Sequence, residues 1–413
     1  MNNANAFKVL LATNFYRSSA PSGENEVFLA EREMLRGRSH EVLEFTRHSD
    51  DLARMGALGT LKGGLVTPWN PAAVRAARRV LRRERPDVLH VHNSFPLLSP
   101  AVFRAARETG TATVLTLHNY RTFCAAGIPL RNGRPCTECL DRHSVWPALR
   151  YKCYRNSRLA TLPVAGMIAL HRTLGTWRKD VDAFIALTQF QRDKLVDAGL
   201  PAERVYVKPH FYPAPPEPLP WDAREPRAVF IGRLGEEKGL HVLLEAWRAW
   251  GPGAPALELI GDGPERTALE AFAREHGLEG RVRFPGRLPF AQTQARLARA
   301  SLLLLPSLCF EGFPMVIREA FALGVPVAAS RLGSMPCLVE EGRNGVLFAP
   351  GDADDLLRRV KGLWNAPGLL ADMAGKARAD FEAKYTEATN YRQLMEIYSS
   401  AIAVRKEKAR HCA

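Results

Sequence analysis

The sequence predicts an α/β protein built from two successive doubly wound domains with parallel sheets. Short apolar runs of strand length alternate with helical patterns from one end of the chain to the other. Strands that alternate with helices are typical of parallel sheets covered by helices. The alternation stops once, in a proline-rich stretch, and then starts again. The 413 residues suit two or three domains, each able to bury its own core.

Each half of the chain has its own series of elements. The first half has expected strands at Lys8–Thr13, Asp87–Val91, Thr113–Leu117 and Val181–Leu187, and a helix at Glu24–Leu35. The second half has expected strands at Ala228–Ile231, Leu257–Ile260, Val282–Phe284, Leu302–Leu305 and Val325–Ala329, and helices at Leu240–Ala249 and Glu265–Glu275. A last helical pattern covers Glu387–Arg410.

The proline-rich stretch, residues 209–226, sets the domain boundaries. It holds seven prolines in eighteen residues, a density that excludes regular helix and sheet interior and indicates a semi-rigid hinge. We therefore expect a first domain at 1–208, which carries a cysteine-rich insertion at 119–158, and a second domain at 227–385. The final helix, within 386–413, is expected to pack back on the first domain.

Composition narrows the class of protein. The chain is 46% hydrophobic and 24% charged, as globular proteins are, and no apolar run approaches the ~20 residues of a membrane-spanning helix. No basic leader precedes the apolar run Val9–Ala12, so we expect a cytoplasmic protein. The net charge of +14 is compatible with nucleic acid, an anionic membrane surface, phosphorylated substrates or a solvated basic face.

Two glutamates in the second half are the strongest functional signal. Glu311 directly precedes Gly312-Phe313-Pro314, and Glu319 follows eight residues after Glu311. Proline suits a first helical turn, so Glu311 is expected just before a helix and Glu319 inside it. Eight residues of helix span ~12 Å, about the distance from a sugar to a ribose across a diphosphate. The helix N-terminus between them would attract the phosphates.

A glycine-rich basic loop follows the first strand of the second half. It reads Gly232-Arg233-Leu234-Gly235-Glu236-Glu237-Lys238-Gly239 and lies between a strand and a helix, where α/β folds bind anions. Arg233 and Lys238 can both reach one diphosphate and stabilise the charge of a departing nucleoside diphosphate. A basic loop paired with its own Glu236 and Glu237 is the alternative.

These two segments resemble glycosyltransferase family 4, whose members are retaining enzymes of the GT-B fold. The resemblance implies two Rossmann-like domains that face each other across a cleft. It implies that Glu311 contacts the donor sugar and Glu319 the ribose, while Arg233 and Lys238 hold the diphosphate. Gly232, Gly312, Phe313 and Pro314 would then belong to the donor site. Cys337 stands where the family commonly has glutamate, which is a departure from the pattern.

The first half adds two candidates by the same resemblance. His118 follows the expected strand Thr113–Leu117, at the place where the family has a histidine facing the donor sugar. Gly23, in Ser22-Gly23-Glu24-Asn25, resembles the family's glycine-rich loop near the donor phosphates, although Ser22 replaces a second glycine. A plain helix N-cap by Ser22 is the alternative for that loop. His92, on a neighbouring strand, is a further candidate.

Four cysteines form a separate signal. Cys124, Cys136, Cys139 and Cys153 are separated by 11, 2 and 13 residues. A Cys-x2-Cys pair with two further cysteines suits a closed structural zinc site. Cysteines without a ligand, and a disulfide or redox pair, stay open as alternatives.

A basic and apolar stretch follows the cysteines. Arginines and lysines flank Leu159–Leu170, which suits either a membrane interface or an ordinary core helix with solvated ends. Many relatives glycosylate lipid-linked acceptors, which favours a peripheral contact with an anionic membrane at its inner face.

The sequence as a whole predicts transfer of a sugar from a nucleoside-diphosphate sugar to a hydroxyl. Retention at the anomeric carbon, and a setting in cell-envelope, exopolysaccharide or lipid-linked glycan synthesis, come from the family resemblance. Two cations at the diphosphate imply no catalytic metal cofactor. The alternatives are an inert nucleotide-sugar binding module, a nucleotide-sugar epimerase or phosphorylase, and a zinc-dependent nucleic-acid binder, although we expect no nucleic acid as a partner.

Overall fold

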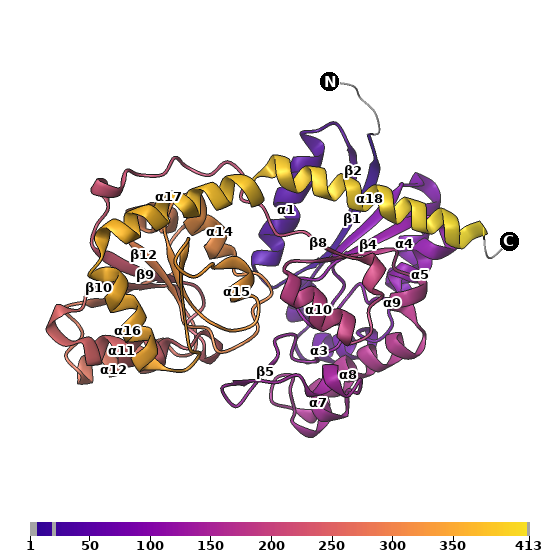
Figure 1. Ribbon diagram of the computed structural model, residues 1–413. Coiled ribbons are helices and arrows are strands. Elements are labelled where there is room, and N and C mark those ends of the chain that lie inside the picture. The colour runs from indigo at the N-terminus through magenta and orange to yellow at the C-terminus, as the bar shows by residue number, and fades with distance from the viewer. Residues whose placement is uncertain (1–5, 19–21, 411–413) are drawn as a thin grey trace. The chain divides into compact units, whose positions relative to one another are not determined.

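The computed structural model of the protein describes residues 6–18 and 22–410 and divides into two compact units (Figure 1). The described part of the first unit comprises residues 6–18, 22–129, 137–209 and 390–410. The second unit comprises Leu130–Cys136 and His210–Thr389.

The first unit is built on one six-stranded parallel sheet with the strand order β2-β1-β3-β4-β7-β8. Its strands are β1 Lys8–Phe15, β2 Glu41–His48, β3 Val88–Asn93, β4 Ala112–Thr116, β7 Ala183–Ala186 and β8 Val205–Val207. All residues of β3, β4 and β7 are buried, because helices cover both faces of the sheet. This double coverage is why the strands appear in the sequence as continuous apolar runs.

Helices connect these strands. They are α1 Gly23–Arg36, α2 Ser49–Arg54, α3 Gly56–Val66, α4 Pro71–Glu84, α5 Val102–Thr109, α6 Glu138–Asp141, α7 Trp146–Arg150, α8 Arg158–Thr173, α9 Thr176–Lys179, α10 Gln189–Asp197 and the 3₁₀ turn η1 Ala202–Arg204. Local chemistry sets several of their ends. The Asn70 side chain accepts hydrogen bonds from the amides of Ala72 and Ala73, and Pro71 opens α4.

The second unit repeats the architecture with the strand order β11-β10-β9-β12-β13-β14, again all parallel. Its elements are η2 Trp221–Ala223, β9 Arg227–Ile231, η3 Glu236–Lys238, α11 Leu240–Trp250, η4 Gly251–Gly253, β10 Ala256–Ile260, α12 Arg266–Glu275, β11 Val282–Gly286, α13 Phe290–Arg299, β12 Leu302–Leu305, α14 Met315–Ala322, β13 Val327–Ser330, α15 Met335–Leu338, β14 Gly345–Phe348, α16 Ala353–Trp364 and α17 Pro367–Lys384. The prediction of two doubly wound parallel-sheet domains is confirmed.

A two-stranded hairpin, β5 Leu130–Arg131 and β6 Arg134–Pro135, directly precedes Cys136. Asn132 and Gly133 occupy its two central positions with φ angles of 52° and 68°. Asn-Gly is the residue pair that tolerates this left-handed backbone, so the turn follows from local sequence.

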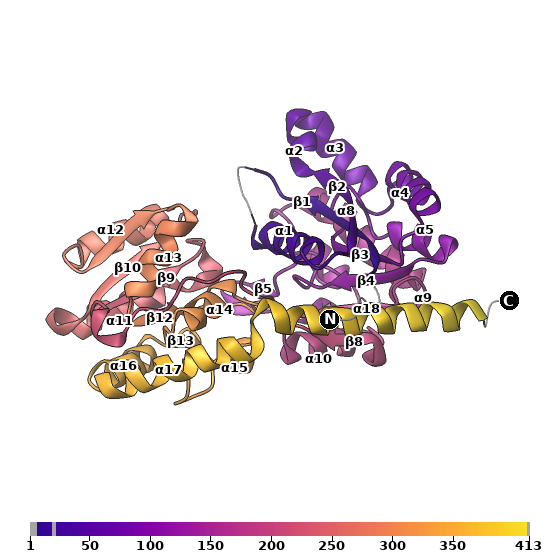
Figure 2. The same cartoon turned by 90° about the horizontal axis from the view of Figure 1, so that it is seen from above.

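The last helix, α18 Glu387–Arg410, belongs to the first unit from Asn390 onward and runs beside its sheet (Figures 1 and 2). The Tyr398 hydroxyl lies 2.9 Å from His90 Nδ1 on β3, and Arg405 forms an ion pair of 2.7 Å with Asp182. Both contacts are buried, so α18 is part of the core of this unit.

The proline-rich segment is fastened to the second unit. The Arg224 guanidinium donates hydrogen bonds to the carbonyl oxygens of Leu219 (3.1 Å) and Leu323 (2.7 Å). Leu323 directly follows α14, so the hydrogen bond to its carbonyl fixes the end of the proline-rich segment against the core of the second unit.

No helix in the described part of the chain combines the length and the apolar character that crossing a bilayer requires.

Candidate active site

The loop between β12 and α14 positions the two glutamates of the strongest motif. Pro314 is the N-cap of α14, with a φ of −65°, and the helix begins at Met315. The sequence predicted proline inside the first turn; the helix starts one residue later, because Pro314 itself has an extended ψ of 105°. Glu311 therefore lies in the loop and Glu319 inside the helix, as predicted.

Glu311 is paired with Lys238. The Lys238 Nζ donates to Glu311 Oε1 over 2.6 Å, and the Ser307 hydroxyl donates to the same oxygen over 2.8 Å. Burial lowers the pKa of Lys238, but the charge of Glu311 and the hydrogen bond to it outweigh burial and raise the pKa overall. The ammonium is therefore charged at neutral pH and lies beside a helix N-terminus, where an anion is favoured.

Close backbone contact holds the Lys238 loop against the Glu311 loop. Gly239 has a φ of +66°, and a Cβ at this position would overlap the carbonyl oxygen of Pro306. The Leu308 amide donates to the Glu237 carbonyl over 2.9 Å. Only glycine fits this left-handed, crowded position, so Gly239 is what brings Lys238 within reach of Glu311.

Arg233 lies in the same loop but nearer to solvent. Its side chain is 62% exposed and forms an ion pair of 3.0 Å with Glu237. The preceding Gly232 packs tightly, since a Cβ on Gly261 would overlap the Gly232 carbonyl. The loop backbone is thus fixed while the guanidinium stays accessible, and the pairing with Glu237 that the sequence offered as an alternative is present.

Glu319 is buried and has a partner that the sequence did not suggest. The Gln294 Nε2 on α13 donates to Glu319 Oε2 over 2.8 Å. Burial raises the pKa of Glu319, opposed by the charge of the neighbouring Arg318 and the hydrogen bond from Gln294. Gln294 lies 25 residues from Glu319 and belongs to no motif, so no sequence signal links the two.

The residues between the glutamates serve packing. The Phe313 ring lies 5.6 Å from the His210 ring and 5.8 Å from the Tyr385 ring, and it is buried among them. Its side chain therefore anchors the loop, which leaves the Gly312 backbone as the part that can face a ligand. The buried Ser334 hydroxyl donates to the Glu311 carbonyl over 2.8 Å.

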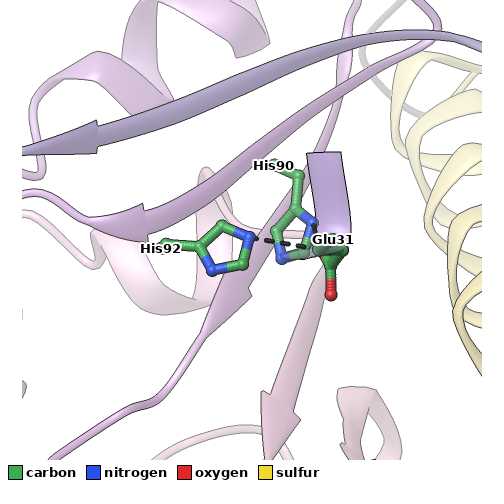
Figure 3. Close-up of side chains that lie close together, drawn as sticks. All are labelled: Glu31, His90 and His92. Atoms are coloured by element: carbon green, nitrogen blue, oxygen red, sulfur yellow. Dashed lines mark hydrogen bonds and ion pairs between the residues drawn. The ribbon is translucent and has the colours of Figure 1, made fainter. Parts of the chain in front are cut away.

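In the first unit, His118 lies two residues beyond β4 and contacts His92 at the end of β3. The distance from His92 Nδ1 to His118 Nε2 is 3.1 Å, and His92 Nε2 lies 3.2 Å from Glu31 Oε1 (Figure 3). If the ionised Glu31 accepts from His92 Nε2–H, then His92 Nδ1 accepts from His118 Nε2–H. Glu31 thereby fixes the tautomer of both rings. Burial and the neighbouring His92 hold the pKa of His118 well below its usual range, so the ring is neutral.

Glu31 is the centre of this cluster, which also contains His90 and Lys208. His90 Nδ1 lies 3.0 Å from Glu31 Oε1, and Lys208 Nζ lies 3.2 Å from Glu31 Oε2. Burial raises the pKa of Glu31, but the charges of Lys208 and the histidines outweigh burial and lower it well below the usual range. We name Glu31, His90, His92, His118 and Lys208 the histidine cluster.

Ligand atoms of Glu31, His90 and His92 lie within 4.8 Å of one another, which is close enough to hold a metal ion. The Lys208 ammonium, however, already supplies the cation to this carboxylate. The donor set therefore fits an internal ion pair between Glu31 and Lys208 better than it fits a metal site.

The spacing of apolar residues on α1 is a sequence signal for a buried Glu31. Val27, Glu31 and Leu35 are spaced by four residues on one face of α1, and all three are buried. A carboxylate on the apolar stripe of a helix indicates a buried partner.

The start of α1 carries Gly23. The Ser22 hydroxyl accepts a hydrogen bond of 3.3 Å from the Glu24 amide, so Ser22 is an N-cap. This was the alternative interpretation of the loop. Glu24 Oε1 in turn accepts from Asn119 Nδ2 over 2.9 Å. The glycine therefore lies at a helix N-terminus that is tied to the residue after His118.

The cysteines are placed in part. Cys139 is buried in a small apolar cluster with Ala148 and Ile168, and Cys153 packs against the same cluster. Cys124 is also buried, and the next residue, Ala125, belongs to this apolar cluster. Cys136 ends the short segment grouped with the second unit. The zinc site stays a prediction.

Comparison with known families decides the identity. The model for "Glycosyl transferases group 1" matches residues 214–380, a range that includes Arg233, Lys238, Glu311 and Glu319. The model for "Glycosyltransferase Family 4" matches residues 23–213, which include Gly23, the histidine cluster and the cysteines. The chain belongs to the group 1, family 4 glycosyltransferases.

Relatives of this glycosyltransferase chain are named for the synthesis of several polysaccharides. It is 30% identical over 228 residues to the amylovoran biosynthesis glycosyltransferase AmsK of Erwinia amylovora, a match that covers 52% of the chain and 56% of AmsK. It is 27% identical over 375 residues to the glycogen synthase of Mycobacterium tuberculosis, covering 87% of the chain and 78% of that protein. The chain spans about half the length of AmsK and of the similar colanic acid glycosyltransferases named WcaL.

Among solved structures, HepE of Anabaena in complex with UDP has the same GT-B fold. The two share 21% identity with a TM-score of 0.64, and the match covers 95% of this chain and 100% of HepE. HepE has also been solved with UDP-glucose, with a TM-score of 0.63 to this chain.

Proposed function

We propose that this chain transfers a glycosyl group from a nucleoside-diphosphate sugar to a hydroxyl of an acceptor, with retention of the anomeric configuration. The observation that carries the proposal is the Lys238–Glu311 ion pair of 2.6 Å at the head of α14, with Glu319 eight residues after Glu311. This arrangement offers a cation and a helix N-terminus to a diphosphate, between two carboxylates that can accept hydrogen bonds from sugar and ribose hydroxyls.

The proposed chemistry uses the two cations as the electrostatic partners of the leaving group. The bond from the anomeric carbon to the phosphate oxygen breaks on the same face where the acceptor oxygen forms its new bond, and the acceptor proton passes to the departing diphosphate. Lys238 and Arg233 stabilise the charge on that diphosphate. Glu311 positions the sugar ring and Glu319 the ribose. We propose no catalytic metal, because Lys238 and Arg233 supply the positive charge.

His118 is proposed to hold the donor sugar by a hydrogen bond rather than to transfer a proton. Its pKa is held far below neutrality by burial and by His92, so it stays uncharged at working pH. The contact of 3.1 Å between His118 Nε2 and His92 Nδ1 orients the ring for this role.

The similarity to HepE, solved with UDP and UDP-glucose, makes a uridine donor the first to test. AmsK and WcaL, named for amylovoran and colanic acid biosynthesis, favour an exopolysaccharide or cell-envelope setting. A cytoplasmic location, with an acceptor that is a sugar or a lipid-linked glycan, belongs to the same proposal.

The test is release of nucleoside diphosphate from UDP-, GDP- and ADP-sugars with candidate hydroxyl acceptors. We expect acceptor-dependent release of nucleoside diphosphate from one donor class. NMR of the product should show the same anomeric configuration that the sugar has in the donor. Glu311→Gln should lower kcat at least a hundredfold. Conversion of the donor into another nucleotide sugar without an acceptor would instead indicate an epimerase. Binding of the donor without turnover in the presence of any tested acceptor would indicate an inert binding module.

We also propose that Cys124, Cys136, Cys139 and Cys153 hold one structural zinc ion. The Cys-x2-Cys pair beside the Asn132-Gly133 turn, and the packing of the half-buried Cys153 against the apolar cluster that contains Cys139, support it. Metal analysis should find one zinc per chain in the wild type and in Cys337→Ser, an exposed cysteine outside the group. Cys136→Ser with Cys139→Ser should lose the metal. Wild-type protein purified with added zinc but free of metal would rule the site out.

A further inference from the structure

A row of exposed leucines marks one surface of the first unit. Leu58, Leu61 and Leu65 on α3, and Leu159 and Leu162 on α8, have side chains that are between 56% and 83% exposed. We name these five residues the leucine surface. The helices α3 and α8 that carry them pack against each other, since a Cβ on Gly64 would lie 3.4 Å from the Pro163 ring.

The glycines of α3 explain why its leucines face outward. A Cβ on Gly63 would lie 2.9 Å from a methyl carbon of Leu52, and one on Gly59 would overlap the Leu52 carbonyl. The glycine face of the helix is therefore packed inward against α2. Leu58, Leu61 and Leu65, spaced by three and four residues, share the opposite face and have no such cover among the described residues.

A cavity of about 740 Å³ opens between α3 and α8. Its walls are mainly apolar, with Phe95 and Val164 among them. Two arginines, Arg17 and Arg155, are the charged residues in its described lining, which contains no carboxylate. A groove with these walls suits a hydrocarbon chain that carries a negative head group at its mouth.

Exposed cations lie on α2, α3 and α8 and in the segment that leads into α8. They are Arg54, Lys62, Lys152 and Arg158. The acidic residues of the neighbouring α2 are Asp50, which accepts hydrogen bonds from the Ser18 amide, and Asp51, which lies 3.8 Å from Arg54, so the cations here outnumber the carboxylates. The electrostatic field at the leucine surface therefore favours an anionic partner.

We propose that the leucine surface docks on an anionic phospholipid bilayer. The leucines of α3 and α8 enter the boundary between head groups and acyl chains, the groove between the two helices takes one acyl chain, and the arginines contact the phosphates. An apolar helix face flanked by cations is the arrangement that binds in the plane of a membrane interface. This docking site extends beyond the proposed transferase chemistry and does not depend on it.

Co-sedimentation with vesicles of phosphatidylcholine, with and without phosphatidylglycerol, tests the proposal on the full chain. We expect binding to the anionic vesicles that weakens with salt. Leu61→Ser with Leu65→Ser should lower the partition coefficient about a hundredfold, because each leucine withdrawn from the apolar layer costs about tenfold. Arg155→Glu with Arg158→Glu should lower the partition coefficient by about fivefold or more for each arginine replaced.

Matched controls lie in the second unit, at an exposed leucine and an exposed arginine. Leu369→Ser and Arg274→Glu should leave vesicle binding unchanged. Because all the substituted side chains are exposed, each variant should keep the wild-type melting temperature.

Three outcomes would overturn the proposal. The first is no binding to either kind of vesicle. The second is binding that the leucine and arginine variants leave intact. The third is a wild-type dimer in solution that Leu61→Ser with Leu65→Ser converts to a monomer without any vesicle binding, which would assign the surface to a second copy of this chain.

Discussion

At the scale of single residues, Lys208 shows how much the first unit depends on one buried charge. Its side chain and that of Glu31 are each 2% exposed, and Lys208 Nζ also donates to Asn390 Oδ1 over 3.0 Å. Two buried ions are tolerated only together, because each compensates for the lost hydration of the other. This ion pair also fixes the orientation of the histidines around it.

Removal of one partner should therefore be more harmful than removal of both. Lys208→Met should lower the free energy of unfolding by about 3–5 kcal/mol, since it leaves the Glu31 carboxylate buried without its cation. Glu31→Leu combined with Lys208→Met should recover much of that loss. Urea denaturation of the four proteins of this double-mutant cycle measures the effect. Losses that simply add would contradict a coupled pair.

His171 predicts a pH dependence of stability. Burial, opposed by a hydrogen bond with the Pro68 carbonyl, lowers the pKa of His171 from 6.5 to about 4 in the folded protein. Above pH 6.5 the ring is neutral in both the folded and the unfolded state. As the pH falls from 6.5 toward 4, the unfolded state takes up a proton that the folded state does not, so the free energy of unfolding must fall.

His171→Phe, which can keep the stacking on Trp69, should flatten that part of the stability curve. Chemical denaturation at a series of pH values from 7 to about 4 measures it, with the difference between wild type and variant as the readout. A constant difference across this range would show that His171 does not contribute.

At the scale of elements, the loop from β9 to α11 is fixed by Gly239. Its left-handed backbone and its contact with Pro306 leave no room for a side chain. Gly277, with a φ of +65° and no atom within 4 Å of a Cβ, has the same backbone without the crowding, and it is the matched control.

Gly277→Ala should cost about 1–2 kcal/mol of stability from left-handed strain alone. Gly239→Ala should cost clearly more, and it should also weaken nucleotide binding at least tenfold, because Lys238 is displaced from Glu311. Thermal unfolding and a nucleotide titration test both effects. Equal losses of stability in the two variants would mean that the contact with Pro306 is not restrictive.

Elements differ in how well their sequences predict them. The strands β3 and β4, buried on both faces, appear as short apolar runs that match the expected strands within a residue or two. The expected helix Glu387–Arg410 matches α18 residue for residue. Helices α2 and α3 were not expected, because α3 contains Gly59, Gly63 and Gly64 and has no amphipathic pattern with a polar face. Packing against Leu52 and Pro163, rather than local propensity, stabilises it.

At the scale of the whole molecule, the sequence predicted the two parallel-sheet units and the residues of local motifs. Arg233, Lys238, Glu311 and Glu319 could be proposed from the sequence because each motif is a short segment between a strand and a helix. Glu31 and Lys208 were missed because 177 residues separate them and only the folded sheet brings them together. Pairs of this kind require the tertiary structure, since neither residue has a distinctive neighbourhood in the chain.

The most direct test of the central claim is thermal stabilisation of the protein by UDP, GDP and ADP, compared with Lys238→Met. A ligand at about 100 times its dissociation constant should add about 2.7 kcal/mol to the stability of the folded protein. We predict that one of the three nucleotides stabilises the wild type and Lys361→Met, an exposed lysine on α16, but not Lys238→Met. No stabilisation by any nucleotide, or stabilisation that survives Lys238→Met, would contradict a diphosphate site at Lys238 and Glu311.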